Sequence, residues 1–322
     1  MAIRSRGRWA SVLGRNATAN PHARAGETGS FGRLRPRWNP LRHARVDQAV
    51  NVPNVRLQDG HTIPQLGYGV WQIPDGQAQE AVATALATGY RHIDTARIYD
   101  NEAGTGQAIR ESGIPRDQVY VTTKLWNDDQ GRDRALRAFD DSLVRLGLDH
   151  IDLYLIHWPK PAEGLYTETF AALQQLKAEG KVRSVGVSNF QIPHLERLIE
   201  ATGEVPVINQ IELHPRFSQP ELREFHARHG IATEAWSPLG QGQILQDPVL
   251  TGIATETGAT VAQVILRWHL QLGNVVIPKS VTPGRIKENF DIFGFELTDE
   301  QVDRITALDV ADGRIGPDPD TF

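Results

Sequence analysis

Four polar side chains stand where strand-like runs of the sequence end, and their types suit proton transfer. Asp94 closes the run of residues 92–95, and Tyr99 follows a few residues later. Lys124 closes residues 119–124, and His157 closes residues 151–157. If these runs are neighbouring parallel strands, their ends share one rim of the fold. We therefore expect the four side chains to converge although they lie far apart along the chain.

The chemistry expected of this set is proton donation to a carbonyl oxygen. Tyrosine, with an ordinary pKa of about 10, is a poor proton donor at neutral pH. A lysine ammonium about 4 Å away stabilises the tyrosinate by roughly 4 kcal/mol, or at most about 3 pKa units. We expect Lys124 to lower the pKa of Tyr99 in this way, Asp94 to keep Lys124 charged, and a neutral His157 to orient the substrate oxygen. Taken singly, each residue also fits a structural role.

The elements that would position these residues alternate regularly. Strand-like runs lie at residues 66–71, 92–95, 119–124, 151–157, 184–188, 207–213, 231–236 and 275–278. Helix-like stretches lie near residues 77–88, 101–112, 131–146, 167–179, 191–201, 218–229, 260–272 and 283–290. Such alternation predicts parallel strands joined by right-handed crossovers. Eight units in this length favour an α/β fold of the closed (β/α)8 TIM-barrel type, with chemistry at the C-terminal ends of the strands.

Two additions to the barrel are expected. Asp59-Gly60 is a turn dipeptide between short extended runs within residues 55–64, which predicts an N-terminal β-hairpin cap. Residues 297–308 predict an additional C-terminal helix, because Thr298 and Gln301 have the spacing of a capping box. Residues 313–322 are rich in glycine and proline and predict a loop.

Residues 1–50 differ in composition from the rest, and we interpret them as a disordered Arg-rich extension to a barrel of residues 51–322. Of 34 basic and 39 acidic residues, ten arginines and two acidic residues lie in residues 1–48, which leaves the remainder with a net charge of −13. The extension also fits a transit peptide, a basic arm for anionic partners, or a start without function.

Composition excludes several classes of function. An acidic body argues against a nucleic-acid-binding surface. The chain has no cysteine, which excludes disulfides, thiolate metal sites and cysteine nucleophiles. We find no apolar run long enough for a membrane helix and no secretory signal, and expect a cytoplasmic protein.

Five motifs together resemble the aldo-keto reductases. They are Gly89–Ala96, Thr122–Trp126, Val185–Phe190, Asn209–Glu212 and Ile277–Ser280, in the order of that family, and the resemblance extends from about residue 52 to the C-terminus. The nearest resemblance is to bacterial 2,5-diketo-D-gluconic acid reductases. It implies NADPH-dependent reduction of aldehydes or ketones, among them keto-sugar acids such as 2,5-diketo-D-gluconate, glyoxals and small aldehydes. It also implies a monomer, with Tyr99 as acid, Lys124 and Asp94 as its tuning residues, and His157 as orienting residue.

The cofactor is expected to be held by strand-end side chains. A Gly-x-Gly-x-x-Gly loop would indicate a Rossmann site, but Gly104-Thr105-Gly106 has Ile109 in place of the third glycine. Side chains at the ends of later runs can bond a carboxamide, and by resemblance they hold the nicotinamide amide: Ser188, Asn189 and Gln210. Trp236 would stack on the nicotinamide, and a glycine-containing loop would approach the pyrophosphate through Ser237, Leu239, Gly240 and Gln241.

A second part of the cofactor site is expected near the last barrel helix. Lys279, Ser280 and Arg285 surround the start of that helix, with Glu288 and Asn289 one turn later. A helix N-terminus flanked by basic groups suits a phosphate. By resemblance this region binds the adenosine 2′-phosphate and the adenine, so we expect NADPH rather than NADH. A solvated charged helix start is the alternative.

The substrate slot is expected between tryptophans. Trp71, Trp126 and Trp158 end or follow strand runs and would wall an apolar slot together with His157, unless they are core residues. The diketogluconate reductases carry phenylalanine in place of Trp71 and a small residue in place of Arg97, and their stretch after Gly242 is longer. Whether a keto-sugar acid is a substrate therefore stays an open question. Arg97 would either favour anionic substrates or point into solvent.

Two other classes of function remain as alternatives. One is a cofactor-binding regulatory or structural protein on the same barrel, since a fold does not fix a function. The other is a metal-dependent hydrolase, for which His226 and His229 have helical spacing but lie on an expected surface helix, remote from strand ends. The intact set of four residues favours an enzyme that acts on a small carbonyl compound without a metal.

Overall fold

A computed structural model describes residues 52–322; the extension expected at residues 1–50 lies outside the described residues. Eight parallel strands follow one another around a sheet in chain order. They are β3 (Tyr68–Gly69), β4 (His92–Asp94), β5 (Tyr120–Leu125), β6 (Ile151–Ile156), β7 (Val182–Ser188), β8 (Ile208–Glu212), β9 (Ala232–Trp236) and β10 (Val275–Val276). Leu66 also bridges Val276 in parallel, and the Gly67 amide donates to the Val276 carbonyl at 2.8 Å. The first and last strands are therefore neighbours, and the predicted closed barrel is confirmed.

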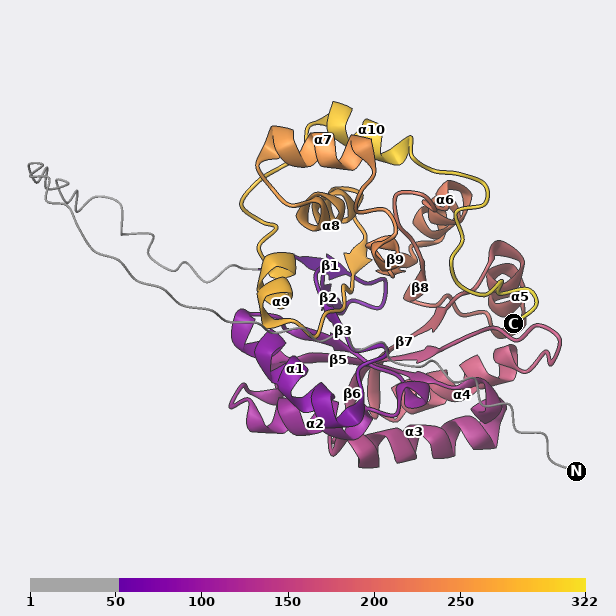
Figure 1. Ribbon diagram of the computed structural model, residues 1–322. Coiled ribbons are helices and arrows are strands. Elements are labelled where there is room, and N and C mark those ends of the chain that lie inside the picture. The colour runs from indigo at the N-terminus through magenta and orange to yellow at the C-terminus, as the bar shows by residue number, and fades with distance from the viewer. Residues whose placement is uncertain (1–51) are drawn as a thin grey trace, which may run out of the picture. The chain divides into compact units, whose positions relative to one another are not determined.

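Helices surround the strands, as Figure 1 shows. Eight lie where the sequence predicts them: α1 (Asp75–Thr88), α2 (Glu102–Glu111), α3 (Arg132–Leu146), α4 (Tyr166–Ala178), α5 (Ile192–Thr202), α6 (Pro220–His229), α8 (Val261–Gln271) and α9 (Pro283–Phe290). Helix α7 (Pro248–Thr257) was not predicted, although Asp247 caps it by accepting from the Val249 amide at 3.0 Å. Within residues 52–322 no single helix could span a membrane; α7 and α8 pass that test only as a pair bent by 89°.

The predicted N-terminal hairpin is present and covers the N-terminal end of the barrel. Strands β1 (Asn54–Arg56) and β2 (Thr62–Pro64) pair antiparallel. Leu57 and Ile63 are buried in a cluster with inward-facing strand residues such as Leu153. The Gln58 side chain donates to the Pro206 carbonyl at 2.9 Å, just before β8 begins. Because the hairpin closes this end, the opposite end is left for chemistry.

Two glycines of α2 serve helix packing. A Cβ on Gly106 would lie 1.9 Å from the Leu146 carbonyl oxygen at the end of α3, and one on Gly104 would lie 2.7 Å from the Asp75 carbonyl oxygen at the start of α1. Only a residue without a side chain allows these approaches. Close helix packing therefore accounts for Gly104 and Gly106, and no nucleotide-binding loop is needed to explain them.

The predicted C-terminal helix is α10 (Asp299–Thr306), and its capping box is formed. Thr298 Oγ1 accepts from the Gln301 amide at 3.2 Å, and Gln301 Oε1 accepts from the Thr298 amide at 2.9 Å. Beyond α10 the chain returns to the barrel, where the amides of Ile315 and Gly316 donate to the Glu212 carboxylate at 2.6 and 2.8 Å. Because Glu212 ends β8, this loop lies at the C-terminal ends of the strands.

Candidate active site

The four residues singled out in the sequence meet at the C-terminal ends of the strands. Asp94 ends β4, Lys124 lies in β5, His157 directly follows β6, and Tyr99 lies in the short helix η2 (Arg97–Tyr99). Lys124 Nζ donates to Asp94 Oδ1 at 2.6 Å and lies 5.1 Å from the centroid of the Tyr99 ring. The Tyr99 and His157 ring centroids are 5.6 Å apart. The sequence-based expectation of convergence is confirmed.

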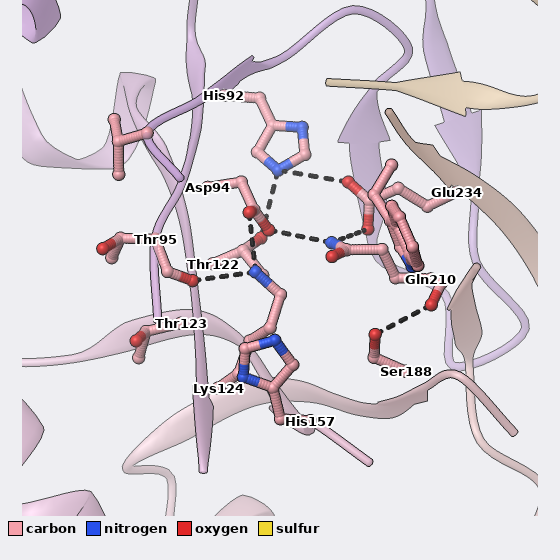
Figure 2. Close-up of polar contacts among 12 residues, drawn as sticks. His92, Asp94, Thr95, Thr122, Thr123, Lys124, His157, Ser188, Gln210 and Glu234 are labelled. Carbon is pink, nitrogen blue, oxygen red and sulfur yellow. Dashed lines mark hydrogen bonds and ion pairs between the residues drawn. The ribbon is translucent and has the colours of Figure 1, made fainter. Parts of the chain in front are cut away.

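A second layer of polar residues lies behind this set (Figure 2). Gln210 Nε2 donates to Asp94 Oδ2 at 2.8 Å and to Glu234 Oε2 at 3.0 Å. Glu234 Oε1 lies 3.7 Å from His92 Nε2, which contacts Thr122 Oγ1 at 3.0 Å. We did not predict a role for Glu234. The signal was available, because Glu234 is the one charged residue in the strand-like run of residues 231–236.

The electrostatics of Tyr99 differ from the expectation. Burial raises the pKa of Tyr99, and the nearby Lys124 ammonium lowers it by less, so that the pKa lies above its ordinary value. The expected net fall was wrong, because it left out the cost of placing a phenolate in a buried site. The raised pKa keeps the phenol protonated, as a proton donor requires.

The other charges agree with the expectation. Burial disfavours the Lys124 ammonium, but Asp94 and then Tyr99 act in the opposite direction, and the pKa of Lys124 is raised. Burial, followed by repulsion from Lys124, holds the pKa of His157 well below its ordinary value. His157 is therefore neutral at neutral pH and keeps one ring N–H to donate.

A cavity of about 550 Å³ opens at this end of the barrel. Its size suits a small-molecule site. Among the residues singled out in the sequence, the lining contains Trp71, Asp94, Tyr99, Trp126, His157, Trp158, Ser188, Asn189, Gln210, Trp236, Ser237, Gln241 and Lys279. Trp71 is 41% exposed and Trp126 half-buried, so neither is a core residue, whereas Trp158 is buried. The remaining candidates do not line the cavity: they are Lys124, which is fully buried, and Leu239, Gly240, Ser280, Arg285, Glu288 and Asn289.

Hydrogen bonds fix the wall formed by β7, β8 and β9. Trp236 Nε1 donates to Asn189 Oδ1 at 2.8 Å, and Asn189 Nδ2 donates to the His157 carbonyl at 2.9 Å. Ser188 Oγ donates to the Gln210 carbonyl at 2.8 Å. Asn189 has φ of 64° and Ser237 φ of 48°, the left-handed region that costs a residue with a side chain of order 1 kcal/mol or more. The wall is thus held by hydrogen bonds and locally strained.

Only Lys279, among the candidate residues in and just before α9, lines the cavity. Lys279 lines the cavity, and Ser280 Oγ accepts from the Thr282 amide at 3.1 Å, just before α9 begins. On α9 itself, Arg285 is exposed, Asn289 is buried, and Glu288 Oε1 accepts from Thr260 Oγ1 at 2.8 Å. The helix start and Lys279 are therefore adjacent in the chain, while the polar groups of α9 lie outside the cavity lining.

Sequence reasoning missed the contribution of the C-terminal loop. Ile315, Gly316 and Pro317 line the cavity. The Phe322 ring centroid lies 4.5 Å from that of Trp158 and 6.3 Å from that of Trp126. The loop was predicted, but its return to the strand ends depends on the distant Glu212 carboxylate, for which the local sequence gives no signal.

Two histidine-containing sets bear on a metal-dependent function. The first set consists of His92, Asp94 and Glu234, each of which has one possible ligand atom within 4.8 Å of those of the other two. Both Asp94 oxygens, however, already accept hydrogen bonds, one from Lys124 and one from Gln210. A cation there would compete with the Lys124 ammonium.

The second set requires a correction, because His226 does not lie on the surface. It is buried between Asn209 and Thr233, with contacts of 3.0 and 2.9 Å. The side chain thus packs α6 against the barrel and is fully engaged, whereas His229 is exposed.

The barrel and its strand-end site define an oxidoreductase, and the chain belongs to the aldo/keto reductase family, whose model matches residues 65–310. It is 58% identical over 270 residues to an aldo-keto reductase of Mycolicibacterium smegmatis, covering 84% of this chain and 98% of the relative. It is 51% identical over 267 residues to a glyoxal reductase of Bacillus subtilis, covering 83% and 96%. A crystal structure of a Gox0644 mutant in complex with NADPH is 50% identical, with a TM-score of 0.82 over 84% of this chain and 99% of that one.

These similarities confirm the family but not the subgroup. They support a nicotinamide cofactor for this chain. The nearest resemblance expected from the sequence, to 2,5-diketo-D-gluconic acid reductases, remains a prediction.

Proposed function

We propose that this protein reduces small aldehydes and ketones, with glyoxals as preferred substrates, by using NADPH and Tyr99 as proton donor. The observation that carries the proposal is the meeting of Tyr99, His157 and the Lys124–Asp94 pair at one end of a 550 Å³ cavity. Proton donor, charge and orienting group are then within reach of one carbonyl oxygen.

Each residue has a separate task. When bound, NADPH supplies the hydride that reaches the carbonyl carbon. Tyr99 gives its phenolic proton to the carbonyl oxygen, which becomes the hydroxyl of the product alcohol. The Lys124 ammonium, held by Asp94, stabilises the phenolate left behind. Neutral His157 donates a hydrogen bond that orients the carbonyl oxygen.

The residues present fit a nicotinamide cofactor. The Trp236 ring is fixed at the cavity wall by Asn189, which supports its proposed stacking role. Both bonds of the Gln210 amide nitrogen go to carboxylates, so its oxygen is the atom that can accept from a carboxamide. We assign the carboxamide to Ser188, Asn189 and Gln210, with Asn189 also positioning Trp236.

The remaining cofactor contacts follow the order of the chain. We assign the pyrophosphate to the loop after β9, through Ser237, Leu239, Gly240 and Gln241. Lys279, Ser280 and Arg285 are assigned to the 2′-phosphate, and Glu288 and Asn289 to the adenine. Support comes from Lys279, which lies both in the cavity lining and just before the start of α9.

The proposed substrate site lies among Trp71, Trp126 and Trp158, with His157 at its base. Arg97 pairs with Asp100 at 2.9 Å and is not part of the cavity lining, so it supplies no anion-binding group there. This favours uncharged carbonyl compounds over keto-sugar acids. The Bacillus subtilis relative named as a glyoxal reductase points in the same direction.

A substrate panel tests the proposal. The values of kcat/KM would be compared for methylglyoxal, glyoxal, small aldehydes and 2,5-diketo-D-gluconate, each with NADPH and with NADH. We expect turnover with NADPH and higher values for the glyoxals than for the sugar acid. Tight NADPH binding without turnover of any carbonyl would instead support the regulatory alternative.

Replacement of Arg285 tests the phosphate assignment. We expect Arg285→Ala to weaken NADPH binding about tenfold or more, since a hydrogen bond to a charged group contributes roughly 1.5–3 kcal/mol. NADH lacks the 2′-phosphate, so its Kd is expected to change less than about twofold. The Kd values would be measured by fluorescence titration, with Lys287→Ala, an exposed residue of the same helix, as control. Equal losses for both cofactors would remove the assignment.

A further inference from the structure

A second carboxylate, Glu234, is buried near Asp94, and Gln210 links the two (Figure 2). One amide nitrogen, Gln210 Nε2, donates to Asp94 Oδ2 at 2.8 Å and to Glu234 Oε2 at 3.0 Å. A carboxylate oxygen of each acid lies within 4.8 Å of one from the other. Glu234 has no exposed surface. Because both acids are buried, their charges act on each other through a medium of lower dielectric constant than water.

Within residues 52–322, the groups that face Glu234 supply a single cation, Lys124. They are His92 and Asp94 from β4, Tyr120 and Lys124 from β5, Gln210 from β8 and Tyr99 from η2, while β10 places Val275 beside it. Lys124 is committed to Asp94 at 2.6 Å. His92 is neutral, because burial lowers its pKa to about 3. Two ionised carboxylates would thus leave one buried negative charge without a counter-charge, which is costly.

A proton on Glu234 removes that charge. Burial, followed by repulsion from Asp94, raises the pKa of Glu234 to about 8. Oε2 accepts from Gln210, whereas Oε1 has no hydrogen-bond partner within residues 52–322. Oε1 is therefore the oxygen that can carry the proton.

Building on the reductase function above, we propose that Glu234 is a positioning residue that carries one proton at neutral pH, releases it in alkaline solution, and so adjusts the acid strength of Tyr99. Ionised Glu234 raises the pKa of both Tyr99 and Lys124. Loss of its proton therefore keeps the Tyr99 phenol protonated at higher pH and extends reduction into the alkaline range.

The pH profile of carbonyl reduction tests this role. Glu234→Gln keeps the oxygen that accepts from Gln210 but cannot ionise. We expect the alkaline limb of its kcat/KM profile to move to a pH about one unit lower. Above that limb kcat/KM should fall about tenfold, and on the acidic side it should change less than about threefold. Glu234→Asp, which keeps an ionisable group, should restore the limb toward its original pH. An unmoved limb, or an equal loss at every pH, would overturn the proposal.

A second measurement needs no turnover. Infrared difference spectra of the unmodified protein should show the carbonyl stretch of a buried carboxylic acid that disappears near pH 8 and is absent in Glu234→Gln. If this signal is present but no carbonyl is reduced, the proposed function fails and the buried proton stands. If the enzyme is active but the signal is missing, the inference about Glu234 fails. Absence of the band from the unmodified protein overturns the inference whether or not the variant folds.

Discussion

Replacing Tyr99 with phenylalanine is expected to lower kcat/KM for carbonyl reduction by about 10²–10⁴-fold, the contribution typical of a positioned general acid. The substitution removes the transferable proton but keeps the aromatic ring. The centroid of this ring lies 5.6 Å from that of His157 and 5.1 Å from Lys124 Nζ. The Kd for NADPH should stay within about twofold, because the lost contact is made with the reacting oxygen in the transition state. Steady-state rates and fluorescence titration measure the two quantities.

Tyr154→Phe provides a matched control for this prediction. Tyr154 is buried in β6 against Phe139, and its hydroxyl has no hydrogen-bond partner within the described part of the chain. It does not line the cavity, so we expect its replacement to leave reduction unchanged. Survival of most of the turnover in Tyr99→Phe would mean that another group supplies the proton.

Replacing Lys124 with methionine is expected to lower the free energy of unfolding by roughly 3–5 kcal/mol and to remove most of the turnover. Lys124 is fully buried and Asp94 is 2% exposed. Without the ammonium at 2.6 Å, Asp94 would remain as a buried charge with only the Gln210 hydrogen bond. Urea denaturation measures the loss of stability.

The pH dependence of that loss identifies its cause. Burial already raises the pKa of Asp94, and loss of Lys124 raises it further. A carboxyl whose folded-state pKa is raised costs stability as the pH rises, so the deficit of Lys124→Met should be largest at neutral pH and shrink toward pH 5. The double variant Lys124→Met/Asp94→Asn should recover much of the stability, because asparagine still accepts from Gln210. A deficit that is the same at all pH values and in the double variant would point to lost packing.

Local sequence was enough to place most of the barrel. The alternation of apolar runs and amphipathic stretches gave the eight parallel strands, and Asp59-Gly60 and Thr298–Gln301 gave the hairpin and the last helix. These features depend on periodicity and on turn and capping chemistry, which act within a few residues. Helix α7 was missed although Asp247-Pro248 has a typical start signal, because its apolar residues follow a loop without a clear period.

The barrel, and the order along the chain of the phenol, ammonium, carboxylate and imidazole groups near its strand ends, could be predicted from the residues alone. Three further features could be seen only in the folded protein. Burial raises the pKa of Tyr99 by more than Lys124 lowers it. Gln210 links Glu234 to Asp94, and Glu212 holds the returning C-terminal loop at the cavity. These features depend on the local dielectric environment or on contacts between residues far apart in the chain. The spacing of neighbouring residues in the sequence does not reveal either.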